Sequence, residues 1–480
     1  MIALYIALGI LAVVLVLLAV CAVRAALCRP PEGAKRTLEQ TEDERARRYA
    51  QQLARLIRSE TVSSRYDADK SRFYAFHQVL EKEFPHIHAV CEKHVFNGSL
   101  LFKWPGQGKG EPIMLMSHHD VVAADGKWTH EPFSGDIENG VLWGRGTQDT
   151  KSSLFCFLTA VEELIADGYT PACDVYLASS CTEEFSGEGA PLTAQYLKEN
   201  GVHLRLLLDE GGAILHEPIG GVKGVFALLG VLEKGYGDLK FTARSNGGHA
   251  SAPVRNSPIP RLARFVCDVE KHDPFVSQLH PTAMEMFRRM TPYMSFGMRL
   301  IFCNLWLFSG LVRKMMPSIS AQGAAMLKTT CAFTTAKGSD GLNVLPQEAY
   351  VTANMRFIHH QPTDESIEIM RKLASKYDIE TEVIYKDYPC PVVDYQSDVF
   401  RMVEDAVHEQ FGGIGVCPYP MTGGTDCKYY TEVCENAVRF APVYMTHQQM
   451  SSIHGLNENI TIAALPDAVD FYKRIIQKSE

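Results

Sequence analysis

The stretch PIMLMSHHD, residues 112–120, carries an apolar run that ends directly in two histidines and an aspartate. Its first part, Pro112–Met116, predicts a short buried strand, with polar residues where the strand ends. The same arrangement recurs where CDVYLAS (173–179) precedes TEEFSGEG and where LRLLL (204–208) precedes DEGG. Such strands alternate with helical patterns, for example Leu154–Ala166, and this alternation predicts an α/β sheet with helices on both faces.

Four of the expected loops carry acidic or imidazole side chains. They are MSHHDVV with His118 and Asp120, WGRGTQDTK with Asp149, TEEFSGEG with Glu183 and Glu184, and LLDEGG with Asp209 and Glu210. Ligands of open α/β sheets bind beyond the carboxyl ends of the strands, so we expect these loops to converge. A fifth candidate, His454 in SIHGLNENI, lies near the C-terminus.

Each of these residues alone has an ordinary structural explanation. A single loop histidine is usually hydrogen-bonded or at the surface, a Glu-Glu pair is usually solvated or at a helix N-terminus, and Asp149 could cap the helix after it. Together, however, neighbouring carboxylates raise each other's pKa, and a divalent cation removes that cost. A mixed set of histidines and carboxylates suits Zn²⁺, with Co²⁺ or Mn²⁺ as alternatives.

The order and spacing of these motifs resemble the M20 family of co-catalytic metallopeptidases and aminoacylases, over roughly residues 45–478. The chain is most similar to the branch with carboxypeptidase S and the N-fatty-acyl-amino-acid synthases/hydrolases. The resemblance implies an α/β fold: a mixed-sheet dizinc peptidase domain with helices on both faces and an inserted α+β lid domain. It also implies a hydrolase that cleaves an amide or peptide bond next to a free carboxylate of a small-molecule substrate.

The resemblance implies a set of metal ligands for two divalent cations. His118 and Asp209 would hold the first cation, Glu184 and His454 the second, and Asp149 would bridge both. Glu210 remains a rival to Asp209 as the ligand from the LLDEGG loop.

Two further roles follow from the resemblance at this site. Glu183 would be the general base that takes a proton from a water shared by the cations. Asp120 would orient His118 as a partner behind the ligand. His119 falls at the variable position of the H-x-D motif and is not expected to be a ligand.

Four residues of the insert and the C-terminal part resemble the substrate-binding set of the family. They are His249 in SNGGHASAP, Asn343 in GLNVLP, Arg356 in NMRF and Gly424 in GGTD. His249 would complete an oxyanion site, often from a neighbouring subunit, and the Arg356 fork would match a carboxylate. The plainer alternatives are a turn histidine for His249, an ion pair on the strand surface for Arg356 and an ordinary Gly-Gly turn for Gly424.

The N-terminal segment Ile2–Val23 is uncharged and almost wholly apolar, and it is long enough to cross a bilayer. A cleaved signal peptide would have a basic start and a shorter apolar core, so we favour an uncleaved single-pass anchor. The flanking charges all lie on its C-terminal side: Arg24, Arg29, Lys35 and Arg36. The positive-inside rule therefore predicts a cytoplasmic catalytic body, which the 13 scattered cysteines also favour.

These patterns divide the chain into consecutive units. We expect an anchor (1–28), a linker (29–44), the catalytic domain in two parts (45–226 and 389–480) and an inserted lid and dimerisation domain (227–388). Within the insert, KGYG between two strand-like runs predicts a hairpin or turn. The apolar segment Met298–Val312 is interpreted as the core of an enlarged insert, with a wall for an apolar substrate or a second contact with the lipid surface as alternatives.

Composition narrows the alternatives for function. The net charge of −9 and the lack of a long basic run argue against a nucleic-acid partner. The alternative class is a non-catalytic binding protein with a peptidase fold. Such proteins usually lose metal ligands, whereas all five candidate ligands and the general base are present here. An N-acyl-amino-acid synthase would use the same site in the reverse direction, which sequence alone does not distinguish.

Overall fold

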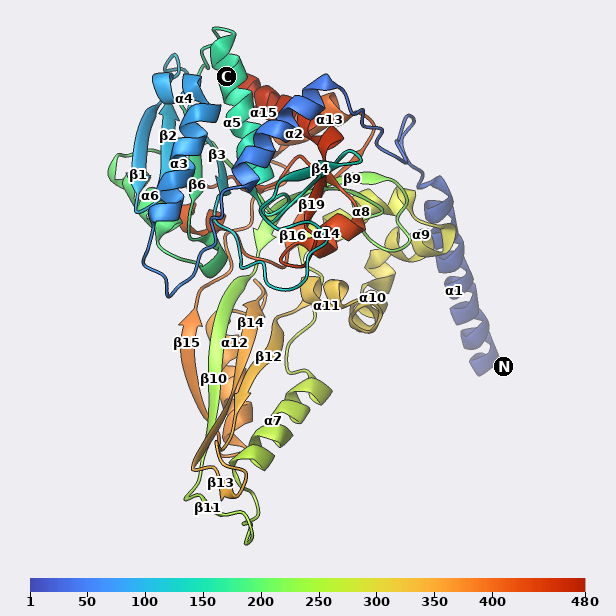
Figure 1. The fold of residues 1–480 in the computed structure, drawn as a ribbon. Helices are drawn as coiled ribbons and strands as arrows, with labels where there is room; N and C mark the ends of the chain where they lie inside the picture. Colours follow the sequence, from blue (N-terminus) through green and yellow to red (C-terminus); the bar gives the residue numbers. More distant parts are fainter. Residues whose placement is uncertain (480) are drawn as a thin grey trace.

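In the computed structural model, which describes residues 1–479, a large body built on a ten-stranded mixed sheet carries a smaller projecting domain and an N-terminal helix (Figure 1). The strands in order are β1 (Glu92–Phe96), β2 (Ser99–Trp104), β6 (Val175–Ser180), β3 (Ile113–His118), β7 (Leu206–Asp209), β17 (Ala437–Arg439), β9 (Val225–Glu233), β8 (Ile214–His216) and β18 (Tyr444–Met445), with β16 (Gly415–Met421) beside β9. Strands β6, β3, β7 and β17 run parallel, so their carboxyl ends share one edge.

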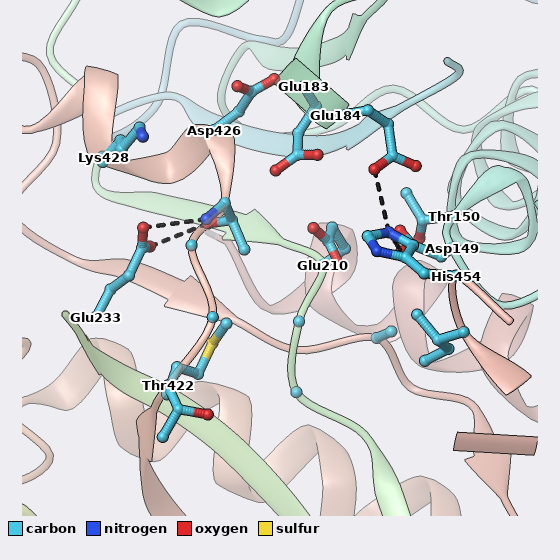
Figure 2. Close-up of a pocket in the computed structure, with 18 of the residues that line it drawn as sticks. Asp149, Thr150, Glu183, Glu184, Glu210, Glu233, Thr422, Asp426, Lys428 and His454 are labelled. Carbon is cyan, nitrogen blue, oxygen red and sulfur yellow. Dashed lines mark hydrogen bonds and ion pairs between the residues drawn. The ribbon is translucent and has the colours of Figure 1, made fainter. Parts of the chain in front are cut away.

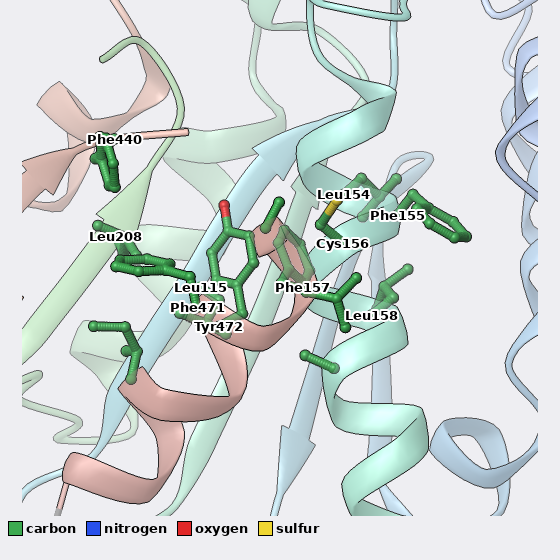
Figure 3. Close-up of a cluster of buried hydrophobic side chains, with 14 of the residues drawn as sticks. Leu115, Leu154, Phe155, Cys156, Phe157, Leu158, Leu208, Phe440, Phe471 and Tyr472 are labelled. Carbon is green, nitrogen blue, oxygen red and sulfur yellow. The ribbon is translucent and has the colours of Figure 1, made fainter. Parts of the chain in front are cut away.

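Helices cover both faces of this sheet, as the sequence predicts. One face packs against α2 (Glu44–Ile57), α3 (Ser71–Glu83), α4 (Pro85–Val90), α5 (Lys151–Ala166), α13 (Asp398–Phe411) and α15 (Leu465–Lys478). The other packs against α6 (Gly189–Glu199) and the 3₁₀ segment η3 (Asp426–Tyr430). Alternation along β3 sends Leu115 to the α5 side and Met114 and Met116 to the α6 side. Figure 3 shows Leu115 and Leu208 under α5 and α15.

The projecting domain is a four-stranded antiparallel sheet with two helices on one face. Its elements are β12 (Thr330–Lys337), β14 (Glu348–Phe357), β10 (Gly235–Arg244), β15 (Glu380–Lys386), α7 (Pro258–His272) and α12 (Thr363–Ser375). Every second residue of β14 is buried, which places an apolar row under the helices. At the far tip, β11 (Gly248–His249) pairs with β13 (Val344–Leu345) (Figure 1).

The connection between the two sheets differs from the expected hairpin. Strand β9 pairs with β16, β17 and β8 in the body, whereas β10 pairs with β14 and β15 in the projecting domain. Only Lys234 separates the two strands, so KGYG is a crossing between domains and the expected hairpin or turn is wrong. The expected boundary at residues 226 and 227 falls inside β9, and the body sheet extends to Glu233.

A helical segment of the insert packs on the body rather than on the projecting sheet. It consists of α8 (Pro281–Met290), α9 (Phe296–Phe302), α10 (Leu305–Ile319) and α11 (Ala321–Leu327). Leu305 and Val312 join an apolar cluster with body residues, but Trp306 is 56% exposed. The prediction that Met298–Val312 belongs to a hydrophobic core is therefore correct for one face of α10.

The N-terminal helix α1 (Ile2–Leu27) projects from the body beside α9 (Figure 1). Contacts near its C-terminal end join it to the insert: Arg24 donates to the Cys303 carbonyl at 3.0 Å, and Asn304 donates to the Cys21 carbonyl at 3.2 Å. Among residues 1–479, α1 is the one unbroken helix that is long and apolar enough to span a membrane. Signal sequences share this property.

Candidate metal centre

The sheet edge brings the predicted loops together. His118 is the last residue of β3, Glu183 and Glu184 lie in the 3₁₀ turn η1 (Glu183–Phe185) just after β6, and Glu210 follows β7. Because these three strands are parallel neighbours, Glu183, Glu184 and Glu210 line one cavity of about 680 Å³, and His118 is buried behind it, 3.0 Å from the cavity residue Asp149. The structure thus brings loops that are far apart in sequence to one site.

Asp149 lies between two histidines at the centre of this site. It ends the loop that follows β5 (Val141–Trp143), and the peptide bond after it is cis. Its Oδ1 lies 3.0 Å from His118 Nε2 and its Oδ2 lies 2.9 Å from His454 Nε2. One carboxylate therefore offers a separate oxygen to each half of the site, as a bridging ligand does.

Two triads of potential ligand atoms share Asp149. His118, Asp149 and Glu210 form one triad, and Asp149, Glu184 and His454 form the other, each with its ligand atoms within 4.8 Å of one another. Figure 2 shows Glu210, Glu184 and His454 around Asp149, with His454 Nε2 3.1 Å from Glu184 Oε2. This donor set of imidazoles and carboxylates fits two divalent cations.

At the LLDEGG loop the structure differs from the expectation, because it places Glu210 rather than Asp209 in the first triad. Asp209 still belongs to β7, and its carboxylate accepts hydrogen bonds from the backbone N–H of Glu210 at 2.8 Å and of Cys427 at 3.0 Å. These bonds direct Asp209 toward the loop at 425–427. Glu210, one residue further along, faces the cavity.

His118 is fixed by Asp120, though mainly through the main chain. Its Nδ1 lies 2.9 Å from the Asp120 carbonyl oxygen and 3.4 Å from the Asp120 carboxylate. That carboxylate also accepts from Ser63 Oγ at 2.7 Å and from the backbone N–H groups of Glu183 and Glu184 at 3.2 Å each. Asp120 thus holds both His118 and the η1 turn in place.

The pKa values of the clustered side chains are shifted by burial and by the neighbouring charges. Burial raises the pKa of Glu183 well above its usual value, and Asp426, Glu210 and Glu184 add to the shift. Burial would also raise the pKa of Asp149, but the two histidines hold it below its usual value. Hydrogen bonds to Asp149 and Glu184 raise the pKa of His454 to about 10. Divalent cations among these carboxylates would relieve their mutual repulsion.

The predicted substrate-binding residues divide into two groups. Arg356 and Gly424 line the cavity, with the Arg356 guanidinium 4.6 Å above the Tyr236 ring. A Cβ added at Gly424 would lie 3.3 Å from Glu233 Oε1, so a side chain there would require Glu233 to shift by a few tenths of an ångström. His249 and Asn343 lie instead at the tip of the projecting domain, where His249 is exposed and its ring Nδ1 lies 2.7 Å from Ser251 Oγ.

His119, the variable residue of the H-x-D motif, belongs to neither ligand triad among the described residues. Its ring is fully buried and stacked on Phe76, and Nδ1 lies 2.8 Å from Ser179 Oγ. Burial lowers its pKa well below the usual value, so the ring is neutral and structural.

Sequence reasoning missed two groups that shape the cavity. Glu233, only 1% exposed, accepts from the Thr425 N–H at 3.0 Å and from Arg439 Nε at 3.1 Å, and so holds the GGTD loop (Figure 2). Lys428 lines the cavity and pairs with Asp387 at 3.0 Å. Nothing in the sequence marks Glu233, because it looks like the ordinary end of an apolar strand.

The fold and site together define a metallohydrolase. Residues 114–478 match Peptidase family M20/M25/M40, so the chain belongs to this family and is an enzyme that hydrolyses amide bonds. Enzymes of the family bind two divalent metal ions.

Individual relatives agree with this placement. The chain is 32% identical to a probable carboxypeptidase S-like 2 of Dictyostelium discoideum, over 90% of this chain and 85% of that one. It is 30% identical to the human N-fatty-acyl-amino acid synthase/hydrolase PM20D1, over 86% of this chain and 85% of that one. The crystal structure of the M20 metallo-carboxypeptidase Sso-CP2 from Sulfolobus solfataricus superposes with a TM-score of 0.68 at 17% identity, covering 91% of this chain and 99% of that one.

Proposed function

We propose that the chain is a dizinc hydrolase that cleaves an amide bond next to a free carboxylate, with an N-acyl amino acid or a short peptide as substrate. The observation that carries the proposal is the pair of ligand triads that share Asp149, with Glu183 beside them. We assign His118, Asp149 and Glu210 to one cation and Asp149, Glu184 and His454 to the other. Zn²⁺ suits this mixture of imidazole and carboxylate best.

Glu183 is placed to act as the proton carrier. Its carboxylate lies in the cavity 3.8 Å from His118 Nε2, and Asp120 fixes the turn that carries it. The bound cations would polarise the amide carbonyl and lower the pKa of a water between them. Glu183 takes the proton of the attacking water and later delivers it to the leaving amine.

The walls of the cavity suggest how a substrate lies in it. Arg356 offers a planar fork to a carboxylate, and no acidic side chain pairs with it among residues 1–479. Leu215, Leu228 and Met445 also line the cavity, and this apolar wall belongs to the same cluster as the helical insert. A carboxylate at Arg356 and an apolar acyl group or side chain on this wall would place the amide between them.

A substrate panel tests this assignment. Metal-depleted full-length protein is assayed with N-acyl amino acids of increasing acyl length, the matching amino acid amides, and dipeptides, with and without added Zn²⁺. We expect hydrolysis that requires the metal and a free carboxylate and that improves with apolar acyl groups. Equal rates on carboxylates and their amides would exclude the role of Arg356.

The reverse reaction should be assayed in the same way, because several relatives, the human PM20D1 among them, are named as synthase/hydrolases. A site that stabilises one transition state catalyses both directions. Incubation with a fatty acid and an excess of free amino acid would show whether condensation is detectable. The position of equilibrium, not a second site, then decides the direction.

Two further features complete the proposal. We propose that α1 remains as a bilayer anchor, which an N-terminal tag retained on the membrane-bound protein would test; loss of the tag would identify a cleaved leader.

We also propose that the projecting domain is a lid that pairs with a second copy and supplies His249 to that copy's site. The exposure of His249 at the tip supports this arrangement.

A further inference from the structure

We propose that Glu458 is a positioning residue of the metal centre, which holds the Asp149 carboxylate between His118 and His454. Glu458 lies four residues after His454 in the HGLNE motif, and its side chain is 0% exposed. It neither lines the cavity nor belongs to a ligand triad within residues 1–479. Its influence on the cations must therefore pass through the residues that it contacts.

The carboxylate of Glu458 gathers the loop that carries Asp149. Its Oε1 accepts from the backbone N–H groups of Gln148 at 2.7 Å and Asp149 at 3.0 Å. Its Oε2 accepts from the Gly146 N–H at 3.1 Å and from Arg145 Nη1 at 2.7 Å. Three amides of one short loop thus point at a single side chain, which fixes the backbone from which the Asp149 side chain projects.

The same residue ties that loop to the segment of His454. The Glu458 carbonyl accepts from the Gly144 N–H at 2.9 Å, and Arg145 Nη2 donates to the Gly455 carbonyl at 2.8 Å. Just beyond, β19 (Asn459–Thr461) pairs with β5. Asp149 and His454 therefore sit on two loops that are clamped together, and the clamp sets the 2.9 Å approach between their side chains.

A carboxylate is the one side chain that satisfies this position. All four groups that face it are donors, and an ionised carboxylate accepts four hydrogen bonds without offering a proton. Its charge is balanced by Arg145, which is itself buried and lies 5.1 Å from the Trp128 ring centre. A glutamine of the same shape would turn an NH₂ donor toward two of these donors and loosen one side of the clamp.

The test compares Glu458→Gln with Glu163→Gln in the full chain. Glu163, on α5, is the control, because its carboxylate is also hydrogen-bonded. It accepts from Tyr49 and, at 2.6 Å, from Lys473, and it belongs to neither triad. Zn²⁺ binding to metal-depleted protein is measured by competition with a chromophoric chelator. We expect E458Q to weaken Zn²⁺ affinity about 10- to 100-fold, the usual effect of a partner behind a ligand, and E163Q to leave it unchanged.

A double-mutant cycle separates positioning from general stability. If Glu458 acts through Asp149, adding E458Q to Asp149→Asn should change Zn²⁺ affinity less than about twofold. Amide exchange at residues 146, 148 and 149 should also quicken in E458Q well below its melting temperature. If E458Q does not fold, Glu458→Asp, which keeps the charge but shortens the reach, is measured in the same cycle. Wild-type Zn²⁺ affinity in the variant, or an undiminished effect in the D149N background, would overturn the proposal.

Discussion

The metal centre and the tip of the projecting domain are built in opposite ways. At the centre, His118, Asp149 and Glu210 come from separate loops, are braced by buried hydrogen bonds and meet within a few ångströms. At the tip, His249 lies on β11, Asn343 directly precedes the paired strand β13, and His249 is exposed to solvent. Both candidate ligand triads of the centre come from one chain, whereas neither His249 nor Asn343 lines the cavity beside them. This difference motivates our proposal that a second copy supplies His249 to the centre.

The largest expected effect comes from Glu183→Gln, which tests whether the centre is catalytic as well as metal-binding. General acid–base groups contribute about 10²–10⁴-fold to rate, so kcat should fall by roughly that factor. Metal content should stay at the wild-type value, because Glu183 belongs to neither triad. Steady-state kinetics with metal analysis of the same sample checks both. A wild-type rate would remove Glu183 from the mechanism.

The next prediction separates the two acidic residues of the LLDEGG loop. Glu210→Gln should lose one bound cation and most of the activity, because Glu210 belongs to the first triad. Asp209→Asn should keep both cations and lower stability by about 1–3 kcal/mol, since the amide replaces a buried acceptor of two N–H groups. Metal analysis and thermal unfolding of the two variants decide this. The reverse pattern would restore Asp209 as the ligand.

These two residues also show what sequence can and cannot reveal. The alternation of apolar runs with helical patterns predicted the α/β sheet. The edge that parallel strands share predicted that the loops converge. The choice between Asp209 and Glu210 depended on where β7 ends, and Asp209 still pairs with Arg439 in the ladder. The crossing at Lys234 and the role of Glu233 depended on which sheet each strand joins, and local patterns do not encode that choice.

A third prediction addresses the tip directly. His249→Ala should lower kcat about 10²–10³-fold, the usual cost of removing one oxyanion donor, with both cations retained. Co-expression of H249A with E183Q should then restore activity, because a mixed pair holds one site with an intact base and an intact partner histidine. Two differently tagged copies, purified in tandem, provide the measurement. No recovery would mean that His249 serves its own chain or none.

The smallest expected effect concerns Arg356, the one predicted lid residue apart from the tip that already faces the cavity. Arg356→Lys keeps the charge but loses the planar fork, so KM for substrates with a free carboxylate should rise about tenfold while kcat changes little. Substrates that end in an amide should show no difference, which makes them the internal control. Since the guanidinium also lies over Tyr236, Tyr236→Leu distinguishes a loss of stacking from a loss of the fork. If Y236L raises KM equally for carboxylate and amide substrates while R356K does so only for carboxylates, Arg356 binds the substrate carboxylate through its fork. If R356K raises KM equally for carboxylate and amide substrates, Arg356 does not bind the substrate carboxylate.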